Sequence, residues 1–463
     1  MPRADSVYKC KECGFQTTNW MGRCSSCGNW NTFIKYDKNS EKVSAQGAVD
    51  SDSGASAEAG VELTPELRDN SGRRSRITTG IAEFDRVLGG GMVPGSLALL
   101  GGAPGVGKST LVLQIAHRLA LNGCRCLYIA GEESEEQLAL RAERLGAFHD
   151  NIKILTVAAW QKILSHCQEY EYELIIVDSI QTVYDSSYDS SPGSVRQVRE
   201  MTSSFQQLAK GYQVPIFLVG HVTKQGQLAG PKTMEHIVDT VLYFHDSSDH
   251  YRLLKAHKNR YGAIDEVGVF TMRDSGLEEV SNPSSAFLQG RPGNCSGSVV
   301  VPVKEGSRTL LIELQALVST GGRGNPRRIT SGLNRERAEL LLAVLDKRLG
   351  LDLAERDVHF NIVGGIEVKE PALDLALAAA VISSYYDIAL PADLSVFGEV
   401  GLAGEIRAVS SHEKRIAEAA KMGFGRLILP TSEEREISNF PDDIKLVEVN
   451  NMKDLLSFLK SIK

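Results

Sequence analysis

The stretch GGAPGVGKST, residues 101–110, restricts the possible folds of this chain more than any other part of its sequence. It has the spacing G-x4-G-K-S and lies between the apolar run SLALL and the amphipathic run TLVLQIAHRLA. Glycines let backbone N–H groups wrap around phosphates, and the helix that follows adds the positive end of its dipole. The sequence therefore predicts a strand, a phosphate-binding loop and a helix that bind ATP with magnesium.

Individual roles follow from the chemistry of such a loop. Lys108 is expected to reach the β- and γ-phosphates, and the hydroxyl of Ser109 is expected to ligate Mg²⁺. The expected nucleotide contacts are Gly102, Ala103, Pro104, Gly105, Val106, Gly107, Lys108, Ser109 and Thr110.

Two other apolar runs lead into acidic residues. ELIIVD ends at Asp178, which fits the carboxylate that orients magnesium through water, although a strand-ending aspartate alone is more often a cap. YIAG is followed by Glu132 and Glu133, and a carboxylate at a strand tip can polarise an attacking water. Alternatively, both glutamates are acidic residues at the start of the next helix, where the helix dipole favours negative charge. We expect Asp178 and one of the two glutamates to be catalytic, and the sequence does not decide which glutamate.

Short apolar runs alternate with amphipathic stretches along most of the chain. Runs at 96–102, 124–131, 173–179 and 214–221 are expected to be buried strands with helices between them. This alternation is typical of an α/β fold with a mostly parallel sheet covered on both faces. After residue 288 a new series begins, which predicts a separate α+β domain. The expected parts are a metal ribbon at 1–36, a flexible polar linker at 37–74, a nucleotide-binding domain at 75–285 and a carboxy-terminal domain at 286–463.

Four cysteines near the start of the chain, Cys10, Cys13, Cys24 and Cys27, have the spacing C-x2-C-x10-C-x2-C. Each C-x2-C pair forms a knuckle that presents two thiolates, and two knuckles complete a tetrahedral sulfur shell. So small a module has almost no core, so the metal would supply most of its folding free energy. We therefore expect a zinc ribbon, with redox-active cysteine pairs as the alternative.

Composition narrows the range of partners. The chain has 463 residues and a formal net charge of -7, which argues against a general polyanion binder, because nonspecific phosphate binding relies on dense Lys and Arg. Any contact with nucleic acid must then use local basic patches. One such patch is KAHKNRYG, residues 255–262, which has three cations and no acid nearer than Asp265. The chain has no apolar run long enough to span a bilayer and no secretory pattern at its start, so we expect a cytoplasmic protein.

Longer stretches of the chain resemble a known family. TTGIAEFDRVLGGGMVPGSLALLGGAPGVGKSTL, YIAGEES, LIIVDSIQT, GHVTK and KNRYG are similar to those of the bacterial RadA (Sms) family of DNA repair proteins, over essentially the whole chain. The resemblance implies a RecA-like core and a DNA-stimulated ATPase of helicase type in homologous recombination. Such an enzyme would bind single-stranded and branched DNA and promote branch migration or strand-exchange extension. It would form rings, expected to be hexameric, with ATP between subunits, and would have recombinase or replication proteins as partners.

The resemblance gives the KNRYG segment a concrete role. It implies that Lys258 and Arg260 approach the γ-phosphate of a neighbouring subunit, where an arginine supplied in trans stabilises charge that develops in phosphoryl transfer. Two alternatives stay open. The segment could be a solvated hairpin that happens to be basic, or it could contact DNA in the channel of the ring.

Three other regions are candidates for DNA contact. Two loops of the nucleotide-binding domain carry cations, and a basic run lies in the carboxy-terminal domain; in each case an ordinary solvated surface is the alternative. His221, at the end of a strand, is a candidate nucleotide sensor. The candidate DNA contacts are Arg196, Arg199, Lys224, Lys232, Arg323, Arg327 and Arg328.

The carboxy-terminal domain resembles the proteolytic domain of Lon proteases, which use a serine activated by a lysine. By this resemblance the serine position is occupied by Ala372 and the lysine position by Glu413. Lys414 is one residue further along a helix, which turns it about 100° away from the required face. We therefore expect an inactive domain that serves as a scaffold and binds DNA. An ATP-dependent protease is one alternative function for the chain, and an ATP switch without motor activity is another.

Overall fold

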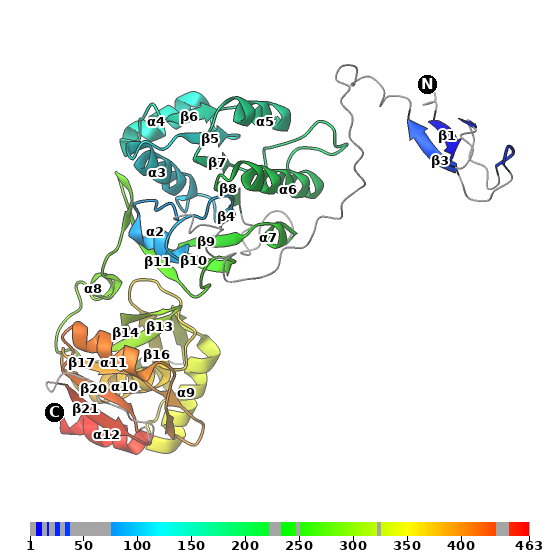
Figure 1. Ribbon diagram of the computed structural model, residues 1–463. Helices are drawn as coiled ribbons and strands as arrows, with labels where there is room; N and C mark the ends of the chain where they lie inside the picture. The colour runs from blue at the N-terminus through cyan, green and yellow to red at the C-terminus, as the bar shows by residue number, and fades with distance from the viewer. Residues whose placement is uncertain are drawn as a thin grey trace, which may run out of the picture. The chain divides into compact units, whose positions relative to one another are not determined.

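The structure is a computed structural model of the whole chain (Figure 1). It describes residues 6–11, 16–17, 24–27, 33–37, 76–221, 233–246, 251–321, 326–431 and 444–462. The chain forms two compact units, Met1–Asp69 and Asn70–Lys463. Among the described residues, no helix is long and apolar enough to cross a membrane.

The first unit contains a small antiparallel sheet of three strands in the order β2-β1-β3. Its strands are β1 (Ser6–Cys10), β2 (Gln16–Thr17) and β3 (Phe33–Asp37). The first cysteine of the predicted ribbon therefore ends a strand, and the second cysteine pair follows in the segment between β2 and β3.

The second unit contains a nine-stranded sheet in the order β12-β11-β10-β9-β4-β8-β7-β5-β6. Strands β4 to β9 pair in parallel, and β10 to β12 extend one side of the sheet with antiparallel pairings. The predicted α/β class is confirmed. The strands are β4 (Leu97–Gly102), β5 (Cys126–Ala130), β6 (Ile152–Leu155), β7 (Leu174–Asp178), β8 (Ile216–His221), β9 (Thr240–Asp246), β10 (Tyr251–Asn259), β11 (Val267–Arg273) and β12 (Gly276–Glu279).

Helices cover both faces of this sheet because its central strands are apolar on both sides. In β4, Ala98 and Leu100 pack with α2, α3 and α4, whereas Leu97 and Leu99 pack with α5, α6 and α7. Successive side chains of a strand point to opposite faces, so a continuous apolar run is what a strand covered on both faces requires. The helices are α2 (Ala82–Val87), α3 (Lys108–Leu121), α4 (Glu135–Leu145), α5 (Trp160–Glu169), α6 (Val195–Tyr212) and α7 (Thr233–Ile237).

A second sheet, of seven strands in the order β15-β16-β14-β13-β17-β20-β21, lies later in the chain. Its core also includes Leu253 of β10 and Val267 and Val269 of β11. The Ala-rich helix α10 is buried from Leu373 to Ser383, since its small side chains let it pack closely against the sheet. The strands are β13 (Ser298–Glu305), β14 (Arg308–Thr320), β15 (Arg328–Ser331), β16 (Arg356–Ile362), β17 (Leu394–Val396), β20 (Arg426–Pro430) and β21 (Lys445–Val449). The helices that follow α8 (Pro283–Phe287) are α9 (Arg335–Leu349), α10 (Leu373–Tyr386), α11 (His412–Lys421) and α12 (Met452–Ser461), and β18 (Glu399–Val400) and β19 (Ile406–Arg407) form a separate pair.

Candidate functional site

The phosphate-binding sequence forms the connection between β4 and α3. Gly105 and Gly107 have φ angles of 79° and 109°, which residues with a side chain rarely adopt. A Cβ on Gly107 would lie 2.8 Å from Cε of Met272, and a Cβ on Gly102 would lie 2.6 Å from the carbonyl oxygen of Phe244. Backbone conformation and close packing therefore both require glycine in this loop.

Lys108 begins α3 and is only 4% exposed. Its Nζ donates hydrogen bonds to the carbonyl oxygens of Gly102 and Ala103, at 2.9 and 3.0 Å. Burial lowers the pKa of the Lys108 ammonium, and the nearby carboxylates of Asp178 and Glu132 oppose that shift. The loop thus holds an ammonium group close to two of the three acids that the sequence singled out.

Asp178 ends β7, and a tyrosine from the neighbouring strand fixes its carboxylate. The hydroxyl of Tyr128, in β5, donates a hydrogen bond of 2.7 Å to Oδ2 of Asp178. Tyr128 is 1% exposed, and burial raises the pKa of its hydroxyl well above the ordinary value, so the group remains a hydrogen-bond donor. The sequence analysis missed this residue, because a tyrosine inside the apolar run CLYIA is usually a core residue.

Glu132 and Glu133 follow β5 but have different partners. Oγ of Ser179, the residue after Asp178, donates a hydrogen bond to Oε1 of Glu132. Glu133 instead forms an ion pair with Arg141 of α4. The helix itself begins at Glu135, after a capping box made by Ser134, so neither glutamate belongs to its first turn. Glu132 is therefore the glutamate that is held beside Asp178, whereas Glu133 is held by α4.

These groups line one cavity of about 660 Å³, a size typical of sites that hold small molecules. The turn between β11 and β12 forms part of its wall, and the side-chain amide of Gln114 in α3 fixes this turn by bonding both the N–H and the C=O of Leu277. This wall could not be predicted from the sequence, because it comes from strands beyond the parallel core. The lining residues are Pro104, Gly105, Gly107, Lys108, Ser109, Thr110, Tyr128, Ala130, Glu132, Glu133, Arg141, Arg144, Asp178, Met272, Arg273, Asp274 and Gly276.

The KNRYG segment lies at the end of the same sheet where its parallel strands begin, opposite the end that carries the phosphate loop. In β10, Asn259 pairs with Thr240, and Thr240 pairs with Ala98 near the start of β4. Gly102, where the phosphate loop begins, pairs instead with Phe244 further along β9. From residue 98 to residue 102 the strand rises about 13 Å, at about 3.3 Å per residue. Within one chain the segment and the phosphate loop are thus held at opposite ends of the strands.

The two cations of this segment are bound differently. Nζ of Lys258 donates hydrogen bonds to the carbonyl oxygens of Glu235, His236 and Val238, at 2.7, 3.3 and 2.8 Å, at the end of α7. Burial, together with the charge of Arg260, lowers the pKa of Lys258. Arg260 forms one ion pair with Asp239, at 3.1 Å, and its side chain is 50% exposed. Lys258 is therefore a helix cap in this conformation, while the guanidinium of Arg260 is accessible.

The rest of the segment packs against the turn after α2. Nδ2 of Asn259 donates to the carbonyl oxygens of Val87 and Leu88, at 3.4 and 3.2 Å. A Cβ on Gly262 would lie 3.1 Å from Cα of Gly89, so this contact depends on glycine. The segment is thus a fixed part of the fold, tied to α2 on one side and to α7 on the other.

Among the candidate DNA contacts, Arg196 and Arg199 are exposed near the start of α6, and Arg196 lies over the ring of Tyr188, 5.7 Å from its centroid. Arg327 is also exposed. Arg328 differs, because its guanidinium donates to the carbonyl oxygens of Arg327, Arg356 and Leu353. Lys224, Lys232 and Arg323 lie outside the described residues, as does the side chain of His221 at the end of β8.

The Lon-like dyad positions hold neither a hydroxyl nucleophile nor an amine base. Ala372 is fully buried just before α10, and Glu413 is exposed in the first turn of α11, next to the exposed Lys414. Close by, the buried guanidinium of Arg415 forms an ion pair with Glu370, two residues before Ala372. An alanine methyl and an exposed carboxylate cannot act as the serine and lysine of a Lon-type dyad.

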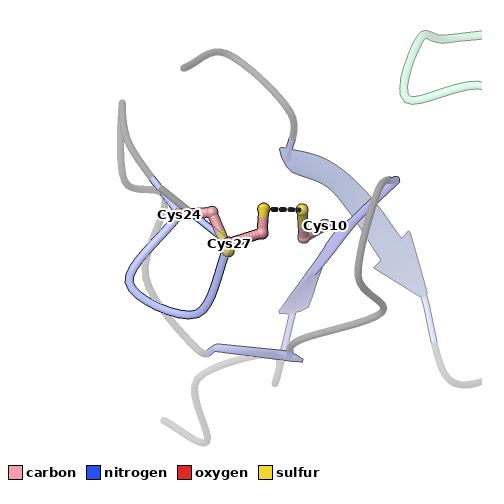
Figure 2. Close-up of side chains that lie close together, drawn as sticks. All are labelled: Cys10, Cys24 and Cys27. Carbon is pink, nitrogen blue, oxygen red and sulfur yellow. Dashed lines mark hydrogen bonds between the residues drawn. The ribbon is translucent and has the colours of Figure 1, made fainter. Parts of the chain in front are cut away.

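The cysteine sulfurs of the ribbon converge. Cys10 and Cys24 are each 1% exposed, and the Sγ atoms of Cys10, Cys24 and Cys27 all lie within 4.8 Å of one another. Figure 2 shows the contact of 3.7 Å between the sulfurs of Cys10 and Cys27. Tetrahedral Zn–S bonds of about 2.3 Å place sulfurs about 3.8 Å apart, so these thiolates fit a zinc ion. Cys13, the fourth predicted ligand, lies outside the described residues.

Three parts of the chain match protein families: the rubredoxin metal binding domain at residues 8–35, the AAA domain at 74–227 and the Lon protease (S16) C-terminal proteolytic domain at 338–461. Among solved structures, a RadB recombinase crystal structure aligns with 44% of this chain and 99% of its own, at 22% identity and a TM-score of 0.36, too low to bear on the argument.

Whole-chain relatives are more similar. The chain is 44% identical to the DNA repair protein RadA of Halalkalibacterium halodurans, over 98% of this chain and 99% of that one. It is 46% identical to the DNA repair protein RadA of Escherichia coli, over 97% of each, and 45% identical to that of Pseudomonas aeruginosa, over 99% and 100%. Identity at this level extends over at least 97% of the chain, and we conclude that the chain belongs to the RadA family of DNA repair proteins.

Proposed function

We propose that this chain is a DNA-dependent ATPase of homologous recombination and DNA repair. It would bind single-stranded and branched DNA and use ATP hydrolysis, as a helicase-type motor, to promote branch migration or strand-exchange extension. The observation that carries the ATPase is the single cavity shared by the phosphate loop, Lys108, Asp178 and Glu132. The relatives named as DNA repair proteins, similar along the whole chain, support the DNA part of the proposal.

The cavity fits a nucleoside triphosphate with magnesium. Residues 102–110 would hold the phosphates through backbone N–H groups, with the Lys108 ammonium on the β- and γ-phosphates and the Ser109 hydroxyl on the metal. Bound magnesium would neutralise charge on the phosphate oxygens. Tyr128 would keep the Asp178 carboxylate aimed at the metal's water, and Ser179 would keep Glu132 in place to orient the attacking water.

We further propose that the chain works as a ring, expected to be hexameric, in which Arg260 acts on the nucleotide of the neighbouring subunit. KNRYG lies at the end of the strands opposite the phosphate loop, so Arg260 cannot reach the nucleotide of its own chain. This position supports action on the neighbouring subunit. In a ring, the end of the sheet where the parallel strands begin in one subunit would face the end where they finish in the next subunit. This arrangement would bring Arg260 close to the neighbouring subunit's nucleotide. Its half-exposed guanidinium makes Arg260, rather than Lys258, the residue that would reach across.

The two glutamates give a direct test of the hydrolytic role. We expect Glu132→Gln to lower the turnover number for ATP by about 10²- to 10⁴-fold with little change in nucleotide affinity, because it removes the group that polarises water. Glu133→Gln is the matched control and is expected to have a smaller effect, since Glu133 is paired with Arg141. Steady-state ATPase assays and fluorescent-nucleotide titrations measure both quantities. A greater loss of turnover in Glu133→Gln would contradict the assignment.

The ribbon is proposed to bind zinc through Cys10, Cys13, Cys24 and Cys27. We expect purified protein to contain one zinc per chain, and Cys24→Ser to lose it and leave the ribbon sensitive to protease, because the metal supplies most of the ribbon's folding free energy. Cys295→Ser, in the carboxy-terminal domain, is the control and should keep the zinc. Elemental analysis and limited proteolysis provide the measurements, and full zinc content in Cys24→Ser would refute the site.

The DNA-dependent activity is tested by ATPase rates with and without single-stranded DNA and by unwinding of forked DNA. We expect DNA to raise the ATPase rate and forked DNA to be unwound in an ATP-dependent manner.

Arg196→Ala and Arg327→Ala, which remove exposed cations, are expected to weaken DNA binding and to make that binding less sensitive to salt. An ATPase that ignores every DNA structure would overturn the proposal. DNA stimulation without unwinding, with ATP-dependent partner binding, would favour a switch.

The carboxy-terminal domain is proposed to be a catalytically inactive scaffold that contributes to ring formation and DNA binding. The residues at the Lon-like dyad positions, Ala372 and Glu413, support this. No ATP-dependent peptidase activity is expected on unfolded substrates, and recombination or replication proteins are proposed as the protein partners.

A further inference from the structure

The turn between β13 and β14, residues 305–308, docks on the nucleotide-binding domain. Gly306, with φ of 64°, packs so closely on the backbone of Asp265 that a Cβ there would lie 1.7 Å from the Asp265 carbonyl oxygen. The N–H of Ser307 donates a hydrogen bond to the same oxygen. The contact uses backbone atoms on both sides, so it fixes the position of the turn closely.

Ion pairs flank this backbone contact. The guanidinium of Arg308 makes two hydrogen bonds to Glu83 in α2, 2.9 Å from Nη1 to Oε2 and 3.2 Å from Nη2 to Oε1. Glu83 is 4% exposed, and its Oε2 also accepts the N–H of Val269 at 3.0 Å. On the other side, Lys255 in β10 forms an ion pair with Glu305. A buried carboxylate held by a two-pronged arginine is among the strongest polar contacts in proteins.

The two elements that this turn contacts are the ones that lead to KNRYG. Helix α2 carries Glu83 and ends at Val87, whose carbonyl oxygen, like that of Leu88, accepts a hydrogen bond from Asn259. Strand β10 carries Lys255 and continues into Lys258 after a register shift between Ala256 and Lys258. Two short paths thus connect the turn of the carboxy-terminal domain to one segment.

We infer that residues 305–308 position Arg260 at the end of the sheet where the parallel strands begin. They do so mainly through the contact between Arg308 and Glu83. The inference rests on the proposed action of Arg260 on a neighbour's nucleotide. The carboxy-terminal domain then controls the position of Arg260 in its own chain. Because Arg260 acts across the interface, the domain affects the rate of ATP hydrolysis in the active site of the next subunit.

The test uses full-length rings that carry Arg308→Gln, with Arg407→Gln as the control. Arg407 forms an exposed ion pair with Glu405 in the same domain, so its loss removes an arginine–glutamate pair that does not face α2. We expect Arg308→Gln to lower the DNA-stimulated turnover number by about tenfold, while nucleotide affinity and ring mass stay as in wild type. Glu305→Gln, a milder change at a partly exposed pair, is expected to act in the same direction and covers the case in which Arg308→Gln folds poorly.

Mixed rings separate positioning from a general structural role. An Arg308→Gln subunit keeps its own phosphate loop, and a Lys108→Ala subunit keeps its own Arg260 and docked turn. Rings mixed from the two are therefore expected to hydrolyse ATP faster than the sum of the separate variants. The reference mixture is Arg260→Ala with Lys108→Ala. If the reference mixture recovers activity and the Arg308→Gln mixture does not, the positioning role is wrong while the proposed action in trans stands. If neither recovers, both fall, and wild-type turnover in Arg308→Gln alone also overturns the inference.

Discussion

Replacement of Lys108 by alanine is expected to lower ATP turnover by at least about 10²- to 10³-fold, because it removes a preorganised positive charge from the phosphates in the transition state. The ammonium group is buried, and the carbonyl oxygens of Gly102 and Ala103 hold it within the loop. Turnover is measured with a coupled ATPase assay in saturating DNA, and nucleotide affinity by fluorescent-ADP titration.

The control for this substitution is Lys162→Ala, which removes an exposed lysine from α5 on the other side of the sheet. It is expected to leave turnover unchanged. The chain keeps its fold in Lys108→Ala because the lysine begins a helix whose buried residues, such as Leu111 and Ile115, are untouched. Turnover within about twofold of wild type would remove the phosphate loop from the mechanism, since any phosphate contact of this lysine is worth more than that.

Replacement of Arg260 by alanine is the second large effect that we expect. An arginine supplied in trans is worth about 10³- to 10⁵-fold in the rate of phosphoryl transfer. The Arg260 side chain is half exposed, and its buried partner Asp239 keeps the hydrogen bond that it accepts from the N–H of Leu97, so the variant should still fold. Lys258→Ala is less informative, because it also strips three carbonyl oxygens at the end of α7 of their donor.

Arg125→Ala is the control for Arg260→Ala. The Arg125 side chain is about as exposed as that of Arg260, forms an ion pair with Glu171, and directly precedes β5 at the end of the sheet where the parallel strands begin. Loss of turnover with DNA binding intact assigns Arg260 to the nucleotide. Loss of DNA binding with basal turnover intact would assign KNRYG to DNA and contradict our account.

The parallel core could be predicted from the sequence because its signals are local. Strands covered on both faces are apolar throughout, and the runs ending at Gly102 and Asp178 are such strands. Spacing within a few residues also defines the phosphate loop and the cysteine knuckles. The class of fold, which the structure confirms, and the proposed nucleotide contacts therefore both rest on short stretches of the sequence.

The rest of the candidate site depends on which distant segments meet. Tyr128 has a polar end only because β7 lies beside β5 and brings Asp178 to its hydroxyl. The wall at Met272 comes from a turn more than a hundred residues after the loop that it covers. Neither contact leaves a periodic or compositional signal, so neither could be found without the sheet order.

The sequence also does not determine which basic residues are accessible. A run of arginines in the sequence indicates available charge, yet Arg328 uses its donors on carbonyl oxygens of its own domain. Lys258 likewise caps a helix, whereas Arg260, two residues away, is half exposed. Burial and partners, which only the folded chain defines, determine which cations can meet a phosphate.

The most direct test of our central claim, that each nucleotide site is completed by Arg260 of the next subunit, is the ATPase rate of mixed rings. Lys108→Ala and Arg260→Ala subunits are each expected to be nearly inactive alone. Combined in equal amounts, they should form some interfaces in which an intact phosphate loop meets an intact Arg260, and activity should rise well above that of either variant. Activity equal to the average of the two variants, in rings shown by native mass spectrometry to be mixed, would contradict the claim.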